Sequence, residues 1–223
     1  MMDTLDQPLG QLACRIPGAT SVFFAHRLDF CNEGKQTLRE AAARKGLGAE
    51  AIAAELDALK DQPATENWDQ AANDVLIEHI LTRYHERHRE QLTELARLAA
   101  RVELVHGGHP EHPAGLADHL EQTLAELERH MQKEEQILFP MILRGMTEMA
   151  RAPVSVMRHE HDGHGEALEQ INQLTRNLTL PEGACNTWRA LYLGLATLER
   201  DLTEHIHLEN NLLFARIDAQ GGF

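Results

Sequence analysis

The sequence predicts an all-α protein, an up-down-up-down four-helix bundle preceded by a small helical domain. Three observations lead to this prediction. Apolar residues recur at helical spacing, no segment alternates as a strand does, and turn residues interrupt the chain at only a few places. Helices of about 25–35 residues joined by short connections lie antiparallel to their neighbours.

Residues 1–60 are predicted to form the small helical N-terminal domain. Turns rich in glycine, proline and asparagine separate its four short amphipathic stretches, at 9–15, 19–26, 36–45 and 49–60. The polar segment 61–68 contains Pro63 and is interpreted as a linker.

The bundle is predicted to span residues 69–218. Its four helical patterns run over 69–105, 114–147, 153–178 and 183–217. The segments between them contain Gly and Pro, as helix breaks do. The second break is placed at residues 150–153, which end in Pro153.

The composition excludes several classes of protein. The 223 residues carry a formal charge of −14 and 4% aromatic residues, which argues against binding to nucleic acid or to an anionic membrane. No apolar run is long enough to span a membrane, and the acidic start does not resemble a secretory signal. Three widely spaced cysteines form no disulfide framework, so a cytoplasmic location is expected.

An internal repeat locates the chemistry within the bundle. Residues 130–139 line up with 205–214, 75 residues apart, and residues 85–92 line up with 161–168, 76 residues apart. His, Glu, Leu and Phe recur at matching places. Two helical hairpins therefore carry equivalent residues at equivalent heights, and the bundle is predicted to have pseudo-twofold symmetry.

The repeated polar residues interrupt the apolar stripe of every helix, which indicates a metal site in the core. Buried carboxylates without compensation cost several kcal/mol, and a metal removes this cost. Nitrogen and oxygen donors suit iron or manganese, and bridging glutamates favour two ions over a tetrahedral zinc. The predicted ligands are four terminal histidines and two bridging glutamates: His85, His130, His161, His205, Glu134 and Glu209.

Four other residues are candidates for contact with the ligands or the metal. Glu126 and Asp201 lie four residues before a ligand histidine, so each is expected either to accept a hydrogen bond from that ring or to face solvent. His106 directly follows the first helix and is a candidate for an extra ligand or a gate. Glu160 neighbours His161, but on an ideal helix it points about 100° away.

The remaining histidines and the cysteines carry weaker expectations. Cys31 precedes a turn into a helix, so it is interpreted either as a redox- or metal-active thiol or as a structural cysteine. Cys14 and Cys185 are expected to be packing residues. His88 and His164 lie on the apolar stripes of their helices and are interpreted either as part of those stripes or as solvated residues. His109 and His112 are expected at the surface, as is His106 unless it is the extra ligand or gate.

These residues resemble the hemerythrin-like di-iron proteins for repair of iron centres, also called the ScdA or iron–sulfur cluster repair family. The resemblance covers nearly the whole chain. In the N-terminal domain it rests on residues 7–10, 16–17, 29–31 and 34–38. In the bundle it rests on residues 83–92, 130–141, 155–157, 160–162 and 205–211.

The resemblance implies a hemerythrin-like bundle holding two carboxylate-bridged, non-haem iron ions. The family's ligands fall on the six residues chosen from the repeat, and the resemblance also implies participation of His106 and Glu160. It implies action under nitrosative and oxidative stress, with nitric oxide or oxygen as the small ligand and damaged iron–sulfur proteins as partners. Similar proteins accompany denitrification as cytoplasmic nitric-oxide-binding proteins.

One departure from the family concerns Cys31. Many relatives carry adjacent cysteines followed by two glycines, whereas this chain reads Cys31-Asn32-Glu33-Gly34. A function that needs two neighbouring thiols is therefore not supported here. The sequence leaves open whether the protein reduces nitric oxide, donates iron, or acts as a scavenger or sensor module without turnover. It gives no sign of an iron-storage shell.

Overall fold

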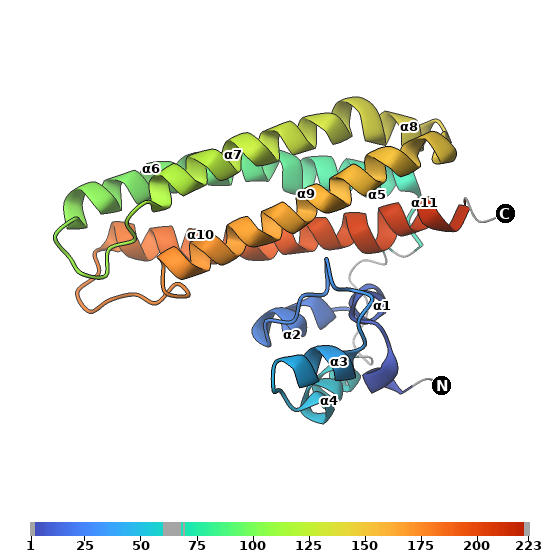
Figure 1. Ribbon diagram of the computed structural model, residues 1–223, viewed down its shortest axis with the longest axis horizontal. Coiled ribbons are helices and arrows are strands. Elements are labelled where there is room, and N and C mark those ends of the chain that lie inside the picture. The colour runs from blue at the N-terminus through green and yellow to red at the C-terminus, as the bar shows by residue number, and fades with distance from the viewer. Residues whose placement is uncertain (1–2, 60–67, 69, 221–223) are drawn as a thin grey trace. The chain divides into compact units, whose positions relative to one another are not determined.

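The computed structural model describes residues 3–59, 68 and 70–220, and over these residues it is built from helices (Figure 1). The one β-type pairing recorded among them is an isolated bridge between Pro8 and Thr37. The prediction of an all-α protein is confirmed. Among the described helices, none combines the length and the apolar character needed to cross a membrane.

The chain divides into two compact units. One unit runs to Leu76 and also contains the chain from Thr203 onward, and the other comprises Ile77–Leu202. The boundary between them therefore falls inside the last long helix. Apart from Trp68, the predicted linker at 61–68 lies outside the described residues.

The N-terminal segment forms four short helices after a single 3₁₀ turn at Thr4–Asp6. The helices are α1 (Leu9–Arg15), α2 (Ala19–Ala25), α3 (Leu38–Arg44) and α4 (Ala49–Leu59). Helix α3 begins with a capping box, in which Thr37 and Glu40 satisfy each other's backbone N–H groups. Leu12, Phe23 and Leu56 are among the buried apolar side chains of this segment.

The four long helical stretches of the bundle begin at residues 73, 116, 147 and 186. The first and second are composed of α5 (Asn73–Ile80), η2 (Leu81–His85), α6 (Glu86–His106), α7 (Leu116–Lys133), η3 (Glu134–Leu138) and α8 (Phe139–Leu143). The third and fourth are composed of α9 (Thr147–Leu174), α10 (Asn186–His207), η4 (Leu208–Leu213) and α11 (Phe214–Gln220). The segments η2, η3 and η4 are π-helical.

The second break in the bundle lies earlier than the sequence predicts. Helix α8 ends near Gly145, whose φ of 69° is left-handed. The N–H of Gly145 donates to Ile142 O and the N–H of Met146 to Met141 O, which is the Schellman arrangement. Helix α9 then starts at Thr147 and contains Pro153 near its beginning. The prediction of a break at Pro153 is wrong, because Gly145 had already ended the preceding helix.

Helix α9 also ends earlier than predicted, at Leu174 rather than near residue 178. Arg176, Asn177 and Leu178 have φ values of 52°, 56° and 57°. Three successive residues in the left-handed region cannot continue a right-handed helix. The N–H of Asn177 donates to Asn172 O at 2.7 Å and closes the end of the helix.

In the first unit, Asn211 of η4 fits against two glycines of the N-terminal segment. A Cβ atom added to Gly10 or Gly34 would lie 2.5 Å or 2.6 Å from Asn211 Oδ1. The amide nitrogen of Asn211 donates to Phe30 O at 3.1 Å and to Cys31 O at 3.4 Å. At Gly34 the added atom would also lie 2.6 Å from the backbone oxygen of Phe30, so this position requires glycine, whereas a side chain at Gly10 would force Asn211 to shift.

In the second unit, the buried carboxylate of Asp201 links α10 to the first long helix. Its Oδ1 accepts a hydrogen bond from Arg83 Nη2 at 2.9 Å. Its Oδ2 accepts from Arg87 Nε at 3.0 Å and from Gln91 Nε2 at 2.8 Å. Burial opposes ionisation, but the hydrogen bonds from Arg83 and Gln91 outweigh it and lower the pKa of Asp201.

We expect Asp201→Asn to lower the free energy of unfolding by about 1–3 kcal/mol at neutral pH, because two guanidinium groups lose a buried anion. Since the folded-state pKa of Asp201 is lowered, its contribution is present above about pH 4 and is lost as the pH falls through that pKa. Urea unfolding of both proteins at a series of pH values measures the difference.

The exposed Asp162 offers a matched control, and Asp162→Asn should leave stability within about 0.5 kcal/mol of the original. A difference between Asp201→Asn and the original protein that stays constant down to pH 3 would contradict the proposed charge interaction.

Candidate metal centre

All six predicted ligands lie in the interior. Each is at most 1% exposed. They come from all four long helical stretches of the bundle: His85 ends η2, His130 is in α7, Glu134 begins η3, His161 is in α9, His205 is in α10 and Glu209 is in η4.

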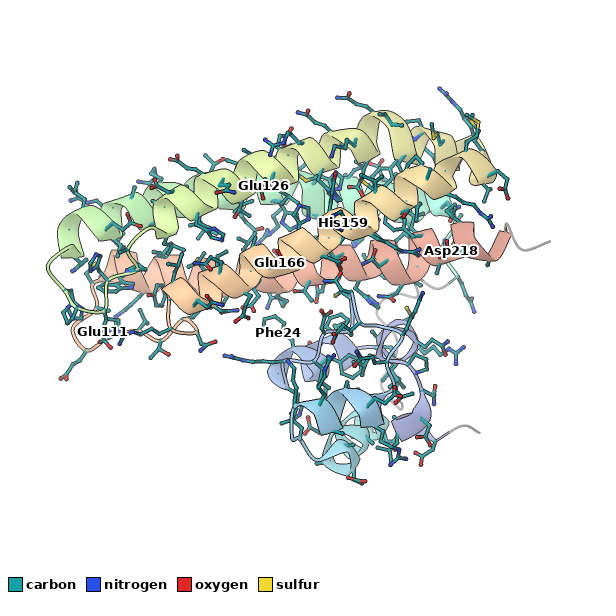
Figure 2. All side chains as sticks on the ribbon, in the orientation of Figure 1. Phe24, Glu111, Glu126, His159, Glu166 and Asp218 are labelled. Carbon is teal, nitrogen blue, oxygen red and sulfur yellow. The ribbon has the colours of Figure 1, made fainter. Side chains whose placement is uncertain are left out.

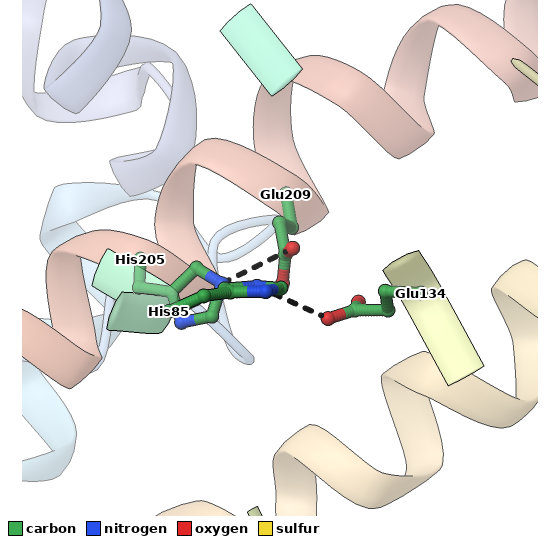
Figure 3. A group of neighbouring side chains, drawn as sticks. All are labelled: His85, Glu134, His205 and Glu209. Atoms are coloured by element: carbon green, nitrogen blue, oxygen red, sulfur yellow. Dashed lines mark ion pairs between the residues drawn. The ribbon is translucent and has the colours of Figure 1, made fainter. Parts of the chain in front are cut away.

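The structure brings these six residues together. Two overlapping groups form, and the ligand atoms of each lie within 4.8 Å of one another: His85, Glu134, His205 and Glu209, and His130, Glu134, His161 and Glu209. Figure 3 shows the first group. Both groups contain the same two glutamates, and each adds two histidines. The sequence repeat relates the two groups, because its equivalences exchange the histidines of one group with those of the other.

The recorded distances show how the donor atoms converge. Glu134 Oε2 lies 3.5 Å from His85 Nε2 and 3.4 Å from His130 Nε2. The Nε2 atoms of His130 and His161 are 3.1 Å apart. Glu209 Oε1 lies 3.1 Å from His205 Nε2. One carboxylate thus faces two imidazoles from different helices, as a bridging ligand does.

Wide helical turns occur at the ligands in three of the four long helical stretches. The N–H of Phe139 donates to the carbonyl of Glu134, five residues earlier, and the N–H of Phe214 donates in the same way to Glu209. Single π turns of this kind are frequent at functional sites. The two turns occupy equivalent positions in the repeat, so the duplication extends to the backbone.

The chemistry of the donor set fits a metal. Four imidazoles and two carboxylates converge in an apolar interior, where the carboxylates need compensating positive charge. Imidazole and carboxylate together favour first-row metals such as iron and manganese. The residues present therefore match the cation site that the sequence predicts.

Glu135 orients one ligand ring and was not predicted from the sequence. Its Oε1 accepts a hydrogen bond from His85 Nδ1 at 2.8 Å and from Arg89 Nη2 at 2.9 Å. The hydrogen bond with His85 is the main reason that the pKa of Glu135 is lowered. A charged acceptor at Nδ1 leaves Nε2 free to act as a ligand. The available signal in the sequence was its position next to the ligand Glu134, but a single glutamate at such a position looks like a surface residue.

Glu160 plays the same part for a second ring. Its Oε2 accepts from His130 Nδ1 at 2.9 Å, and its other oxygen pairs with Lys133. Burial raises the pKa of Glu160, but the hydrogen bonds from Lys133 and His130 outweigh it, so the pKa is lowered. Glu160 thus contacts a ligand ring and belongs to neither group of ligand atoms.

Of the two alternatives for Glu126, a hydrogen bond to the His130 ring is not observed, because the two ring nitrogens face Glu160 and Glu134. Glu126 Oε1 instead accepts from Gln122 Nε2 at 2.9 Å. Glu126 and Glu160 line a surface pocket of about 440 Å³ between α7 and α9. Figure 2 labels Glu126 on α7 and His159 and Glu166 on α9, all three of which line this pocket.

The two other candidates, Asp201 and His106, belong to neither group of ligand atoms. The recorded hydrogen bonds of Asp201 go to side chains of the first long helix, so its carboxylate is used there rather than on the His205 ring. His106 is 21 residues beyond His85 on one continuous helix, which places it about 30 Å along the axis. The expectation that His106 is an extra ligand is wrong for this reason.

His88 and His164 are buried, at 0% and 5% exposed, and so are not solvated residues. Each follows a ligand histidine by three residues, which places it on the same helix face. The ring of His164 packs edge-on against His130, with centroids 4.7 Å apart. Their burial favours the interpretation that both belong to the core-facing stripes.

The structure favours the structural interpretation of Cys31. Its thiol is buried and donates to Thr203 O at 2.9 Å. Burial, with the nearby carboxylates of Asp29 and Glu204, raises the pKa of this thiol well above its usual value. The next helix begins only at Leu38, so no helix N-terminus activates Cys31.

Comparison with known proteins gives two family matches and many similar relatives. Residues 76–217 match the hemerythrin HHE cation binding domain, and residues 5–60 match a domain of unknown function, DUF542. The chain is 56% identical over 216 residues to the "Iron-sulfur cluster repair protein YtfE" of Yersinia pseudotuberculosis serotype IB (strain PB1/+), covering 96% of this chain and 98% of that protein.

A protein of the same name from Yersinia pestis (strain Pestoides F) is 55% identical over 216 residues, with the same coverage of both chains. The family model and these relatives agree with the cluster of buried histidines and glutamates described above. The chain therefore belongs to the iron–sulfur cluster repair family, and its bundle is a hemerythrin-like, cation-binding domain.

Proposed function

We propose that the centre holds two iron ions, bridged by Glu134 and Glu209. One observation carries this proposal: two groups of four ligand atoms share the same two glutamates. A single ion uses one such group and leaves two buried histidines of the other without a role. Two ions would use all six residues, with two histidines and both carboxylates available to hold each one.

This donor count leaves room for a small ligand. Four protein donors fill four positions of an ion that can take six, so positions remain open for a diatomic molecule. When bound, the iron pair supplies redox-active Lewis acids with one electron available from each ion. The protein's own residues hold the ligand nitrogens in place, through Glu135 on His85 and Glu160 on His130.

We further propose that the reduced centre binds nitric oxide during nitrosative and oxidative stress, and that it supports repair of damaged iron–sulfur clusters. The printed names of the relatives support the repair role. The open positions on a buried ferrous pair support nitric oxide or oxygen as the ligand. Damaged iron–sulfur proteins are then the macromolecular partners.

Metal analysis tests the ligand assignment. We expect about two iron ions per chain in the original protein and a large loss of iron in a Glu134→Gln, Glu209→Gln double variant, because both shared ligands lose their charge. Glu126→Gln is the matched control, since Glu126 lies outside the ligand groups, and it should keep full iron. Elemental analysis for iron and manganese gives the result. Unchanged iron in the double variant would refute the assignment.

Glu135→Gln tests the orientation of the His85 ring. We expect a loss of iron affinity of about tenfold or more, because the ring loses its charged acceptor. Glu128→Gln is a close control, since Glu128 binds the same Arg89 and no ligand ring. Competition with a ferrous chelator measures the affinities. Equal affinities for the two variants would show that the hydrogen bond between Glu135 and His85 has no effect on metal binding.

Anaerobic titration tests the small ligand. We expect nitric oxide to change the visible and electron paramagnetic resonance spectra of the reduced, iron-loaded protein in a saturable way. The double glutamate variant should show no such change. A flat titration of the original protein would contradict nitric oxide binding. With excess reductant, continuous release of nitrous oxide indicates turnover, whereas a single binding event indicates a scavenger or sensor.

A further inference from the structure

A pair of reactive side chains lies away from the metal centre, at the C-terminal end of α6. Its histidine is about 30 Å along the helix from His85. His106 Nε2 is 3.1 Å from the sulfur of Cys185. Both side chains are half-buried. They come from segments 79 residues apart in the sequence, so the fold brings them together. We call them the thiol–imidazole pair.

The surrounding helices hold the pair in this geometry. Cys185 immediately precedes α10, and its carbonyl accepts the N–H of Arg189, which begins the helical hydrogen bonds. One turn further on, Trp188 is 1% exposed and packs against the His106 ring, with centroids 5.0 Å apart. His109 packs edge-on against the same indole at 5.5 Å. The imidazole is therefore fixed by a buried aromatic ring.

The chemistry of the pair is that of a nucleophile beside a base. A thiol becomes nucleophilic when a neighbouring imidazole takes its proton, and the required contact is a hydrogen-bond distance such as the one observed. Cys185 also directly precedes α10, and the N-terminus of a helix favours negative charge near it.

The other two cysteines do not share this arrangement. Cys31 is buried and donates its thiol hydrogen to Thr203 O. Cys14 lies 3.7 Å from His207 Nε2, a longer contact than the one between Cys185 and His106. Burial lowers the pKa of the His207 ring to about 4, so this ring is a weak base for a thiol. Cys185 is the cysteine whose partner can act as a base.

Thiol chemistry suits this pair better than metal binding does. Over the chain as described, groups of three or more histidine, cysteine or acidic ligand atoms form at the six-ligand centre and do not include Cys185. A closed metal site takes about four protein donors, whereas this pair offers one sulfur and one nitrogen.

We propose that Cys185 and His106 form a thiol-modification site that exchanges with low-molecular-weight disulfides. The thiol proton of Cys185 moves to His106 Nε2 as the sulfur attacks one sulfur of the disulfide. A new S–S bond joins Cys185 to that half, the original S–S bond breaks, and the other half leaves as a thiolate. Cys185 is oxidised to a mixed disulfide, and the released half is reduced.

The test uses the full chain and the chromogenic reagent 5,5′-dithiobis(2-nitrobenzoic acid). We expect one fast equivalent of thiol per native chain. Cys185→Ser removes this fast phase, whereas Cys31→Ser and Cys14→Ser retain it. His106→Ala slows the fast phase by about tenfold or more, and added imidazole restores part of the rate. A fast phase that persists in Cys185→Ser, or an unchanged rate in His106→Ala, overturns the proposal.

Two further measurements separate reactivity from folding. Circular dichroism should show the same helix content in all four variants, and iron content should stay unchanged because the pair lies far from the metal centre. In the unmodified protein, brief exposure to glutathione disulfide followed by peptide mapping should place the glutathionyl group on Cys185. Modification mainly at Cys14 or Cys31 would also overturn the proposal.

Discussion

The structure depends on compensating two carboxylates inside an apolar helical bundle. Glu134 and Glu209 are fully buried and face four imidazoles. Because buried charge is expensive, these glutamates are tolerable only where positive charge meets them. This requirement explains why every long helical stretch gives up part of its apolar stripe at the same depth, and why Glu135 and Glu160 lie behind two of the rings.

The centre could be read from the sequence because it is duplicated. A single His-x-x-x-Glu pair is common on helices, but two copies on core faces are not, so all six ligand positions followed from the repeat. Helix ends were less predictable. The sequence placed a helix break at Pro153 instead of Gly145, because the left-handed conformation of Gly145 is seen only in the backbone.

The repeat does not predict the residues behind the ligands, because it breaks down there, and Glu160 followed only from the family resemblance. The counterpart of Glu135 is Asn210, whose amide lies 3.5 Å from Cys31 O and so faces the N-terminal segment instead of a ligand ring. The counterpart of Glu160 is Tyr84. A pattern search that relies on duplication therefore finds the ligands and misses their supports. The spacing of four residues between Glu126 and His130 did not decide whether Glu126 reaches the His130 ring, because helix phase alone does not show which carboxylate does so.

The wide turns at Glu134 and Glu209 constrain the number of residues in η3 and η4 as well as the identity of the ligands. Each turn closes over five residues, from the glutamate to a buried phenylalanine. Deleting one residue inside such a turn would restore regular helical bonding but rotate everything beyond it by about 100°. Phe139 and Phe214 would then leave the core while the ligands stayed in place. The number of residues in each segment is therefore fixed by the need to keep both the glutamate and the phenylalanine in the interior.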